Sequence, residues 1–97
     1  MILKNGSYIQ VNIINSKEML RISKLYKGKN YATDVLTFNY SKDNLYKKGD
    51  LYGEIYVNID AAKKQASKYG NTVEQEVAFL VSHGMLHMQG IHHNNDV

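Results

Sequence analysis

The segment LYGEIYVNI at positions 51–59 constrains the fold more than any other stretch of this sequence. Its odd-numbered positions carry leucine, glycine, isoleucine, valine and isoleucine, whereas its even-numbered positions carry tyrosine, glutamate and asparagine. Alternation with a period of two is typical of a β-strand with one buried face. Such a strand needs neighbouring strands and a layer that covers its apolar face. The segment therefore predicts a sheet packed against helices.

Two further segments favour strands. YIQVNII at Tyr8–Ile14 places isoleucine, valine and isoleucine at alternate positions. TDVLTFNY at 33–40 is rich in β-branched and aromatic residues, which strands prefer. The polar stretch 41–50 predicts a loop between the second and third strands, and 91–97 predicts an exposed tail.

Three helices are predicted by their start and stop signals. Each begins at a side chain that can accept a hydrogen bond from the first-turn amides, namely Asn15, Asp60 and Thr72. Thr72 and Gln75 together form a capping box, and Gly28 is typical of a helix stop. The expected helices span 15–27, 61–69 and Val73–Met88. The order of elements predicts one α+β domain over 1–97, with a small mixed β-sheet and helices packed on one face.

The composition excludes several kinds of site. Cysteine is absent from the 97 residues, so disulfides and thiolate zinc sites are excluded. No apolar run approaches the roughly 18 residues of a membrane span, and the N-terminal MILKNGSYIQ lacks the apolar core of a signal peptide. We therefore expect a cytoplasmic protein with no membrane partner. The formal charge of +3 fits an anionic partner such as RNA, although many proteins carry as much.

All four histidines of the chain lie in the segment SHGMLHMQGIHH at 82–93. His83 and His87 are four residues apart on the predicted third helix, so their imidazoles share one face, one turn apart. Gly90 can end that helix, and His93 follows the turn in the pattern H-x-x-x-H-x-x-G-x-x-H. Three imidazoles so arranged can hold zinc and leave its fourth position open, as in catalytic sites. The alternative is a solvated helix end rich in histidine, since an isolated i,i+4 pair usually has no function.

The same histidine spacing occurs in metzincin peptidases, whose pattern H-E-x-x-H-x-x-G-x-x-H places the general base directly after the first histidine. Gly84 occupies that position here. This argues against peptide hydrolysis and for a reaction that depends less on a carboxylate. Glu54 and Glu76 are candidates to orient a histidine N–H, although such residues are more often ordinary surface carboxylates.

Three stretches carry a family resemblance. SHGMLHMQGIHH resembles the H-G-x-L-H-L-x-G-Y-D-H signature of the YbeY family of bacterial endoribonucleases and rRNA maturation factors. YKGKNYATDVLTFNY is similar to the family's Y-R-G-K-D-x-P-T-D-V-L-S-F-P segment. GEIYVNIDAAKKQASKYGNTVEQEVAFL is similar to its G-D-I-x-I-S…A…Q-A…Y-G-H-S…E…L segment. The resemblance runs from about Tyr8 to His93, with the motifs in the family's order.

The resemblance implies a zinc metalloprotease-like fold and a specific activity. That activity is a zinc-dependent, single-strand-specific endoribonuclease that matures the 3′ end of the small-subunit 16S rRNA and serves ribosome quality control. By the family register, one zinc ion per chain would be held by His83, His87 and His93. Lys27 would be the catalytic and RNA-binding residue, and Lys29 a weaker RNA contact. Ribosomal RNA would be the partner, with ribosomal proteins or a ribosome-associated GTPase as further candidates.

Several features depart from the family pattern. Lys27 replaces an arginine and can meet a phosphate only as a point charge. Asn39 stands where the family has proline, and His92 stands where it has the aspartate beside the third histidine. The chain also looks short at both ends, without the family's first strand and helix and without the segment after the third histidine. Two alternatives stay open, a metallopeptidase and a non-catalytic metal-binding protein that interacts with RNA or the ribosome.

Overall fold

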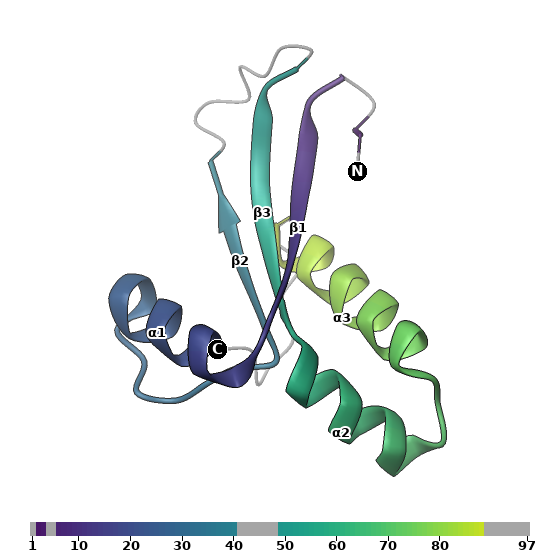
Figure 1. Cartoon of the computed structure of the whole chain (residues 1–97). Coiled ribbons are helices and arrows are strands. Elements are labelled where there is room, and N and C mark those ends of the chain that lie inside the picture. Colours follow the sequence, from purple (N-terminus) through teal and green to yellow (C-terminus); the bar gives the residue numbers. More distant parts are fainter. Residues whose placement is uncertain (1, 4–5, 41–48, 89–97) are drawn as a thin grey trace.

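All six predicted elements form, and their ends differ from the expected ones by no more than two residues (Figure 1). A computed structural model describes residues 2–3, 6–40 and 49–88 of the chain. The elements are β1 (Tyr8–Ile14), α1 (Ser16–Lys27), β2 (Val35–Asn39), β3 (Leu51–Asn58), α2 (Ile59–Tyr69) and α3 (Val73–Met88). The expected loop at 41–50 and tail at 91–97 lie largely or wholly outside the described residues.

The strand with the clearest alternation is the central one. The three strands lie in the order β1-β3-β2, with β1 parallel and β2 antiparallel to β3. The register pairs Ile9 with Gly53, and Val35 with Val57. The mixed sheet and the α+β class are therefore confirmed, with β1 and β2 as the outer strands among the described residues.

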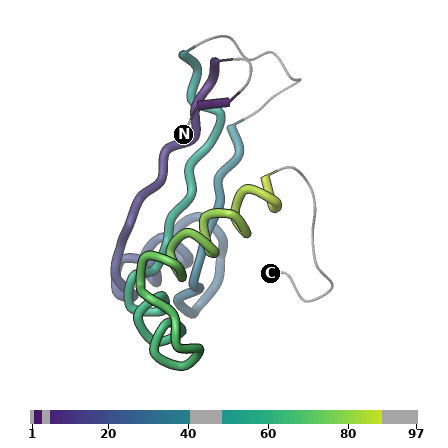
Figure 2. Tube along the Cα trace, turned by 90° about the vertical axis from the view of Figure 1, so that its right-hand side faces the viewer, coloured from purple at the N-terminus to yellow at the C-terminus, as the bar shows by residue number. Residues whose placement is uncertain are grey.

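The helices divide between the two faces of the sheet. One face packs against α2 and α3, and its buried cluster consists of Ile9, Val35, Ile55, Val57, Ala62, Leu80 and Met88. The opposite face packs against α1, and its buried cluster consists of Met19, Ile22 and Leu36. Figure 2 shows α2 and α3 in front of the strands and α1 behind them. The expected packing on one face thus holds for α2 and α3 only, because the alternate residues of β2 and β3 are apolar enough to bury a second layer.

Two of the three predicted helix starts are confirmed, and one is wrong. The Glu18 amide donates to Asn15 Oδ1 at 2.9 Å, and the Gln75 amide donates to Thr72 Oγ1 at 3.1 Å. The cap of α2 is Asn58 rather than Asp60, since Asn58 Oδ1 accepts from the amides of residues 60 and 61 at 3.0 and 3.3 Å. The carboxylate of Asp60 accepts instead from the Ser16 amide at 2.8 Å.

Asn58 also joins three segments at the end of the central strand. Its side chain is 2% exposed. Its Nδ2 donates to the carbonyl of Thr33 and to Ser16 Oγ, both at 3.1 Å. Because an unpaired buried amide would be costly, these bonds fix the starts of α1 and α2 relative to the segment that leads into β2.

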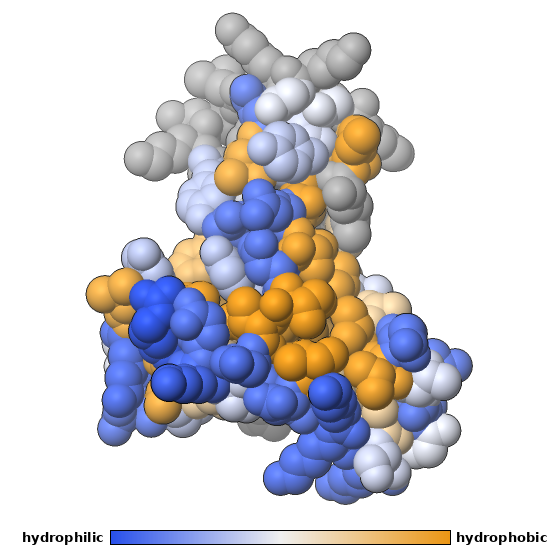
Figure 3. Space-filling model, viewed as in Figure 1, coloured by the Kyte–Doolittle hydropathy of each residue, from blue (hydrophilic) through white to orange (hydrophobic). Residues whose placement is uncertain are grey.

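The surface that carries β1 is partly apolar (Figure 3). Val11 and Ile13 of this outer strand are 36% and 48% exposed. No helix in the described part of the chain is long and apolar enough to cross a membrane.

Candidate functional site

The predicted histidine pair lies on α3, which packs very closely against the sheet. Gly84 of α3 is buried, and a Cβ atom built there would lie 3.1 Å from the Cγ2 atoms of Thr37 and Ile55. Leu80 and Met88, one turn to either side, are also buried. This glycine therefore lets the helix backbone approach β2 and β3, and it fixes which face of α3 points inward.

The last turn of α3 is fastened to the ends of β2 and β3. A Cβ built on Gly53 would lie 2.5 Å from the carbonyl oxygen of Phe38 and 2.8 Å from Met88 Cε, so only glycine admits the methionine here. Asn39 Nδ2 donates to the Met88 carbonyl at 3.1 Å. Sequence reasoning noted Asn39 only as a departure from the family's proline. A proline side chain could not donate this bond, which satisfies one of the carbonyls left open at a helix end.

The structure brings the rings of His83 and His87 together, as their spacing predicts. Their centroids are 4.4 Å apart, with an angle of 61° between the ring planes, and both side chains are half-buried. Phe79, one turn earlier, stacks on His83 at 6.3 Å and 21°. Three rings at i, i+4 and i+8 thus line one side of α3.

The donor set of this pair suits a divalent metal ion, although it is incomplete. Two imidazoles one turn apart on a fixed helix are a typical two-ligand set for zinc. The predicted third ligand, His93, and its neighbour His92 lie outside the described residues. Within the described ranges, no group of three His, Cys, Asp or Glu side chains is placed to hold a metal ion. The three-histidine site therefore stays a prediction.

The packing of α3 explains why position 84 is a glycine, and this explanation also concerns the peptidase alternative. Its Cα faces the side chains of Thr37 and Ile55 rather than the imidazoles' side of α3. A glutamate at this position would run into the buried sheet, since a single added carbon already makes tight contacts. The packing of α3 therefore requires a small residue where metzincins carry their general base. This packing does not favour peptide hydrolysis, because that reaction uses a glutamate at this position.

The two carboxylates considered as partners of the histidines are bound elsewhere. Glu76 is 5% exposed and accepts from Asn71 Nδ2 at 2.7 Å. Glu54 lies on the α1 side of the sheet and accepts from the hydroxyls of Tyr40 and Tyr56 at 2.8 and 3.2 Å. Partial burial, together with the bond to this carboxylate, raises the pKa of Tyr40 to about 12, and the same causes raise the pKa of Tyr56.

Lys27, predicted as the catalytic and RNA-contacting lysine, lies on the other face of the sheet from the histidines. Lys27 is in the last turn of α1, and its Nζ is 4.7 Å from the centroid of the Phe38 ring. Lys29 Nζ lies 5.9 Å from the Tyr31 ring centroid. An aromatic ring can hold an ammonium group in place without neutralising its positive charge, as a carboxylate would.

Strand β2 connects the lysine and the histidine sides. Phe38 lies under Lys27, while the preceding residue, Thr37, lies under Gly84 next to His83. The two sets of residues therefore flank one outer strand instead of sharing one pocket. On the lysine side, a cavity of about 270 Å³ beside Phe38 is lined by Arg21, Ile22, Tyr26, Tyr40, Glu54 and Tyr56.

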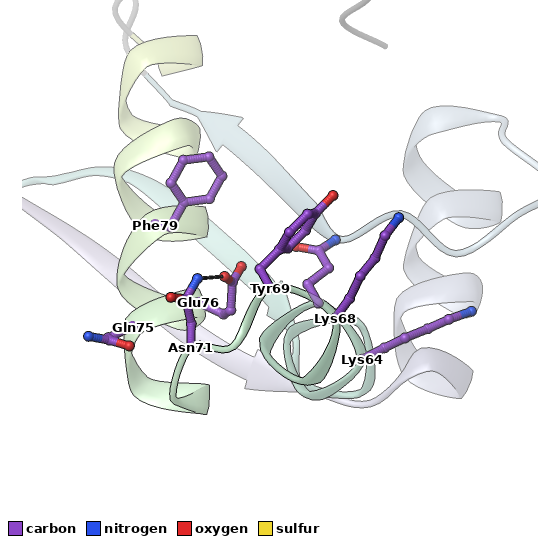
Figure 4. A pocket seen from close by; sticks show the side chains of 8 residues that line it. Lys64, Lys68, Tyr69, Asn71, Gln75, Glu76 and Phe79 are labelled. Carbon is purple, nitrogen blue, oxygen red and sulfur yellow. Dashed lines mark hydrogen bonds between the residues drawn. The ribbon is translucent and has the colours of Figure 1, made fainter.

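Sequence reasoning missed a larger groove of about 900 Å³ between α2 and α3 (Figure 4). Lys64, Lys68 and Tyr69 line it from α2, and Phe79 lines it from α3. A signal was present in the sequence, because two lysines four residues apart share one face of a helix. The pattern could not show, however, that a second helix lies beside that face.

Comparisons with known proteins agree with the predicted resemblance. The sequence model described as "Endoribonuclease YbeY" matches residues 1–97. The protein named endoribonuclease YbeY from Malacoplasma penetrans is 37% identical over 94 residues, which are 97% of this chain and 62% of the relative. The one from Bacillus licheniformis is 34% identical over 92% of this chain and 61% of the relative.

A solved structure extends the likeness to three dimensions. The solution structure of TM1509 from Thermotoga maritima matches with a TM-score of 0.63 and 31% identity, over 93% of this chain and 56% of the other. The chain thus spans less than two thirds of the length of these relatives. A family match over the whole sequence, a shared fold and the motif around the histidine pair lead to one assignment: this chain belongs to the YbeY family.

Proposed function

We propose that this protein is a metal-dependent endoribonuclease that cleaves single-stranded RNA, with one zinc ion on His83, His87 and His93. One observation carries the proposal. The adjacent rings of His83 and His87, with centroids 4.4 Å apart, lie on one side of β2, and the cation of Lys27 lies on the other. A strand of RNA that crosses the edge of the sheet at β2 could reach both.

The chain's own residues would bind and orient the RNA. Lys27 would hold a phosphate as a point charge, and the ring of Phe38 beneath it would limit where the ammonium moves. The close seat of Gly84 on the sheet would keep the two imidazoles at a fixed position relative to β2. When bound, zinc lowers the pKa of a coordinated water and polarises a phosphoryl oxygen, and this chemistry needs no carboxylate from the Gly84 position.

The finer parts of the proposal follow from family membership. We infer that the substrate is ribosomal RNA, at the 3′ end of the small-subunit 16S rRNA, and that the protein acts in the cytoplasm in ribosome quality control. Ribosomal proteins or a ribosome-associated GTPase are the partners proposed with it. The relatives are named endoribonuclease YbeY, and this name supports the class of reaction.

Metal analysis and an RNA cleavage assay test the site together. The purified protein is expected to carry about one zinc ion per chain and to cleave single-stranded RNA but not duplex RNA, and a chelator should stop the cleavage. His83→Ala and His87→Ala should lose zinc and cleavage together. His92→Ala is the matched control and should keep both, because His93 is the assigned third ligand. Unchanged zinc content in the first two variants would refute the ligand assignment.

Variants of Lys27 test the phosphate contact. Loss of one charged contact is expected to lower cleavage by Lys27→Ala about tenfold or more, while Lys27→Arg should keep or raise it. If neither the wild type nor Lys27→Arg cleaves RNA that it binds, the chain is a non-catalytic RNA-binding protein.

A further inference from the structure

The groove between α2 and α3 has the features of a nucleic-acid contact surface. Its volume is about 900 Å³, and it runs between the second half of α2 and the first half of α3. Figure 4 shows Lys64, Lys68 and Tyr69 on one side of it and Phe79 on the other. Helix α2 therefore contributes two cations and one ring to the groove, and α3 contributes a second ring.

The aromatic side chains of this groove are more exposed than the fold requires. Tyr69 is 64% exposed and Phe79 is 62% exposed. Lys68 Nζ lies 5.4 Å from the Tyr69 ring centroid, so a charge and a stacking surface are adjacent. Exposed rings beside cations are the usual means by which proteins hold the bases and phosphates of a single strand.

The accessible charge of the groove is positive. Lys64 and Lys68 are both exposed. The one carboxylate in the lining belongs to Glu76, which is 5% exposed and is bound by Asn71 Nδ2 at 2.7 Å. The exposed charged side chains of the lining are thus two lysines, whereas its carboxylate is buried and bound, and this balance favours a polyanion as ligand.

The groove is also continuous with the histidine pair. Phe79, which lines it, stacks on His83 at 6.3 Å, and the His83 ring is in edge contact with the His87 ring. A base stacked on Phe79 would lie one helical turn from the proposed point of cleavage. This continuity distinguishes a strand of substrate RNA from an unrelated acidic ligand.

We propose that the α2–α3 groove binds the nucleotides of single-stranded RNA that flank the position held at His83 and His87. In this arrangement, Lys64 and Lys68 contact phosphates, and Phe79 and Tyr69 stack on bases. The inference rests on the proposed function, since it takes RNA as the substrate. It adds a second binding surface that Lys27 and the histidines do not supply.

Equilibrium binding of fluorescently labelled single-stranded RNA of about a dozen nucleotides tests the groove, in the presence of a chelator and over a range of salt concentrations. Phe79→Ala should weaken binding about fivefold or more. The slope of log K against the logarithm of the salt concentration should be shallower by about 1.4 in the double variant Lys64→Ala/Lys68→Ala. This is the change expected when two phosphate contacts of a single strand are lost. Lys63→Ala, an exposed lysine of α2 outside the lining, is the control and should stay near wild type.

Each outcome separates the groove from the proposed function. If the wild type binds RNA and both groove variants bind it equally well, the groove inference fails while the proposed function stands. If the wild type binds no RNA in this assay but cleaves it when zinc is present, only the groove inference fails; if it neither binds nor cleaves RNA, both fail. An acidic peptide that displaces RNA and loses its own binding in the same variants would overturn the assignment of RNA to this groove. Lys68→Glu, which changes an exposed side chain only, provides a second folded variant if Phe79→Ala melts early.

Discussion

Replacing Gly84 by alanine tests how closely α3 lies on the sheet. Two effects of opposite sign are expected. Alanine in a helix interior is favoured over glycine by about 1 kcal/mol. Against this, the new methyl group would lie 3.1 Å from two Cγ2 atoms, on Thr37 and Ile55, and overpacking of a buried site costs about 1–3 kcal/mol. The net change should be a destabilisation of about 0–2 kcal/mol.

A second variant on the same helix separates the two effects. Ala78 is an exposed residue of α3, so Ala78→Gly should lose about 1 kcal/mol through helix propensity with little change in packing. Adding its destabilisation to that of Gly84→Ala then leaves the packing cost alone, expected at about 1–3 kcal/mol. Both free energies of unfolding are measured by urea titration, with equal slopes as evidence of a common unfolded state.

The result that refutes the reasoning is a sum near zero. In that case Gly84→Ala would stabilise the protein by as much as Ala78→Gly destabilises it, and the glycine would carry no packing role. The packing argument against the peptidase alternative would then no longer hold, because a larger side chain could be accommodated at that position.

Three further predictions follow from the contacts around the site. Asn39→Ala should destabilise the protein by about 0.5–1.5 kcal/mol, because the partly buried Met88 carbonyl loses its donor, and urea titration checks it. Asn58→Ala should cost about 2–4 kcal/mol, since a helix cap and a buried amide network are lost together, whereas Asp60→Ala should cost less by the same assay. Tyr40 should ionise near pH 12 instead of 10.0, as followed by phenolate absorbance. Because its folded-state pKa is raised, the stability it supports is complete below pH 10.0 and falls as the pH rises toward about 12. A Tyr40→Phe variant that lost a phenol of ordinary pKa would contradict the assigned hydrogen bond to Glu54.

The sequence predicted the elements of this fold well because their signals are local. Alternation located β3, and the helix caps Asn15 and Thr72 located the starts of two helices. The cap of α2 was predicted at the wrong residue, which shows that local signals alone do not determine where a helix starts. Asn58 and Asp60 are equally good caps by type, and the choice depends on the pairing of β3, whose last residue donates its amide to the Asp34 carbonyl at 2.9 Å.

The candidate site divides in the same way. The spacing of His83 and His87 predicted that their rings meet, since one helix determines that contact. The face taken by α1 depends on how three strands align, so periodicity could not place Lys27 opposite the histidines. The role of Gly84 depends on a distance between a helix and a sheet. The sequence motif showed only that Gly84 stands where metzincins have a glutamate, and it contained no information on that distance.

The alternation of β2 makes the two sides of the candidate site mutually dependent. Thr37 and Phe38 are neighbours in sequence, yet one supports the helix with the histidines and the other supports Lys27. A shift of this strand by one residue against β3 would exchange their faces, placing an aromatic ring under Gly84 and a threonine under the lysine. An insertion or deletion just before Val35 would thus disrupt both sides at once. A designer who wishes to change the proposed RNA contact must therefore change side chains on this strand while keeping its length.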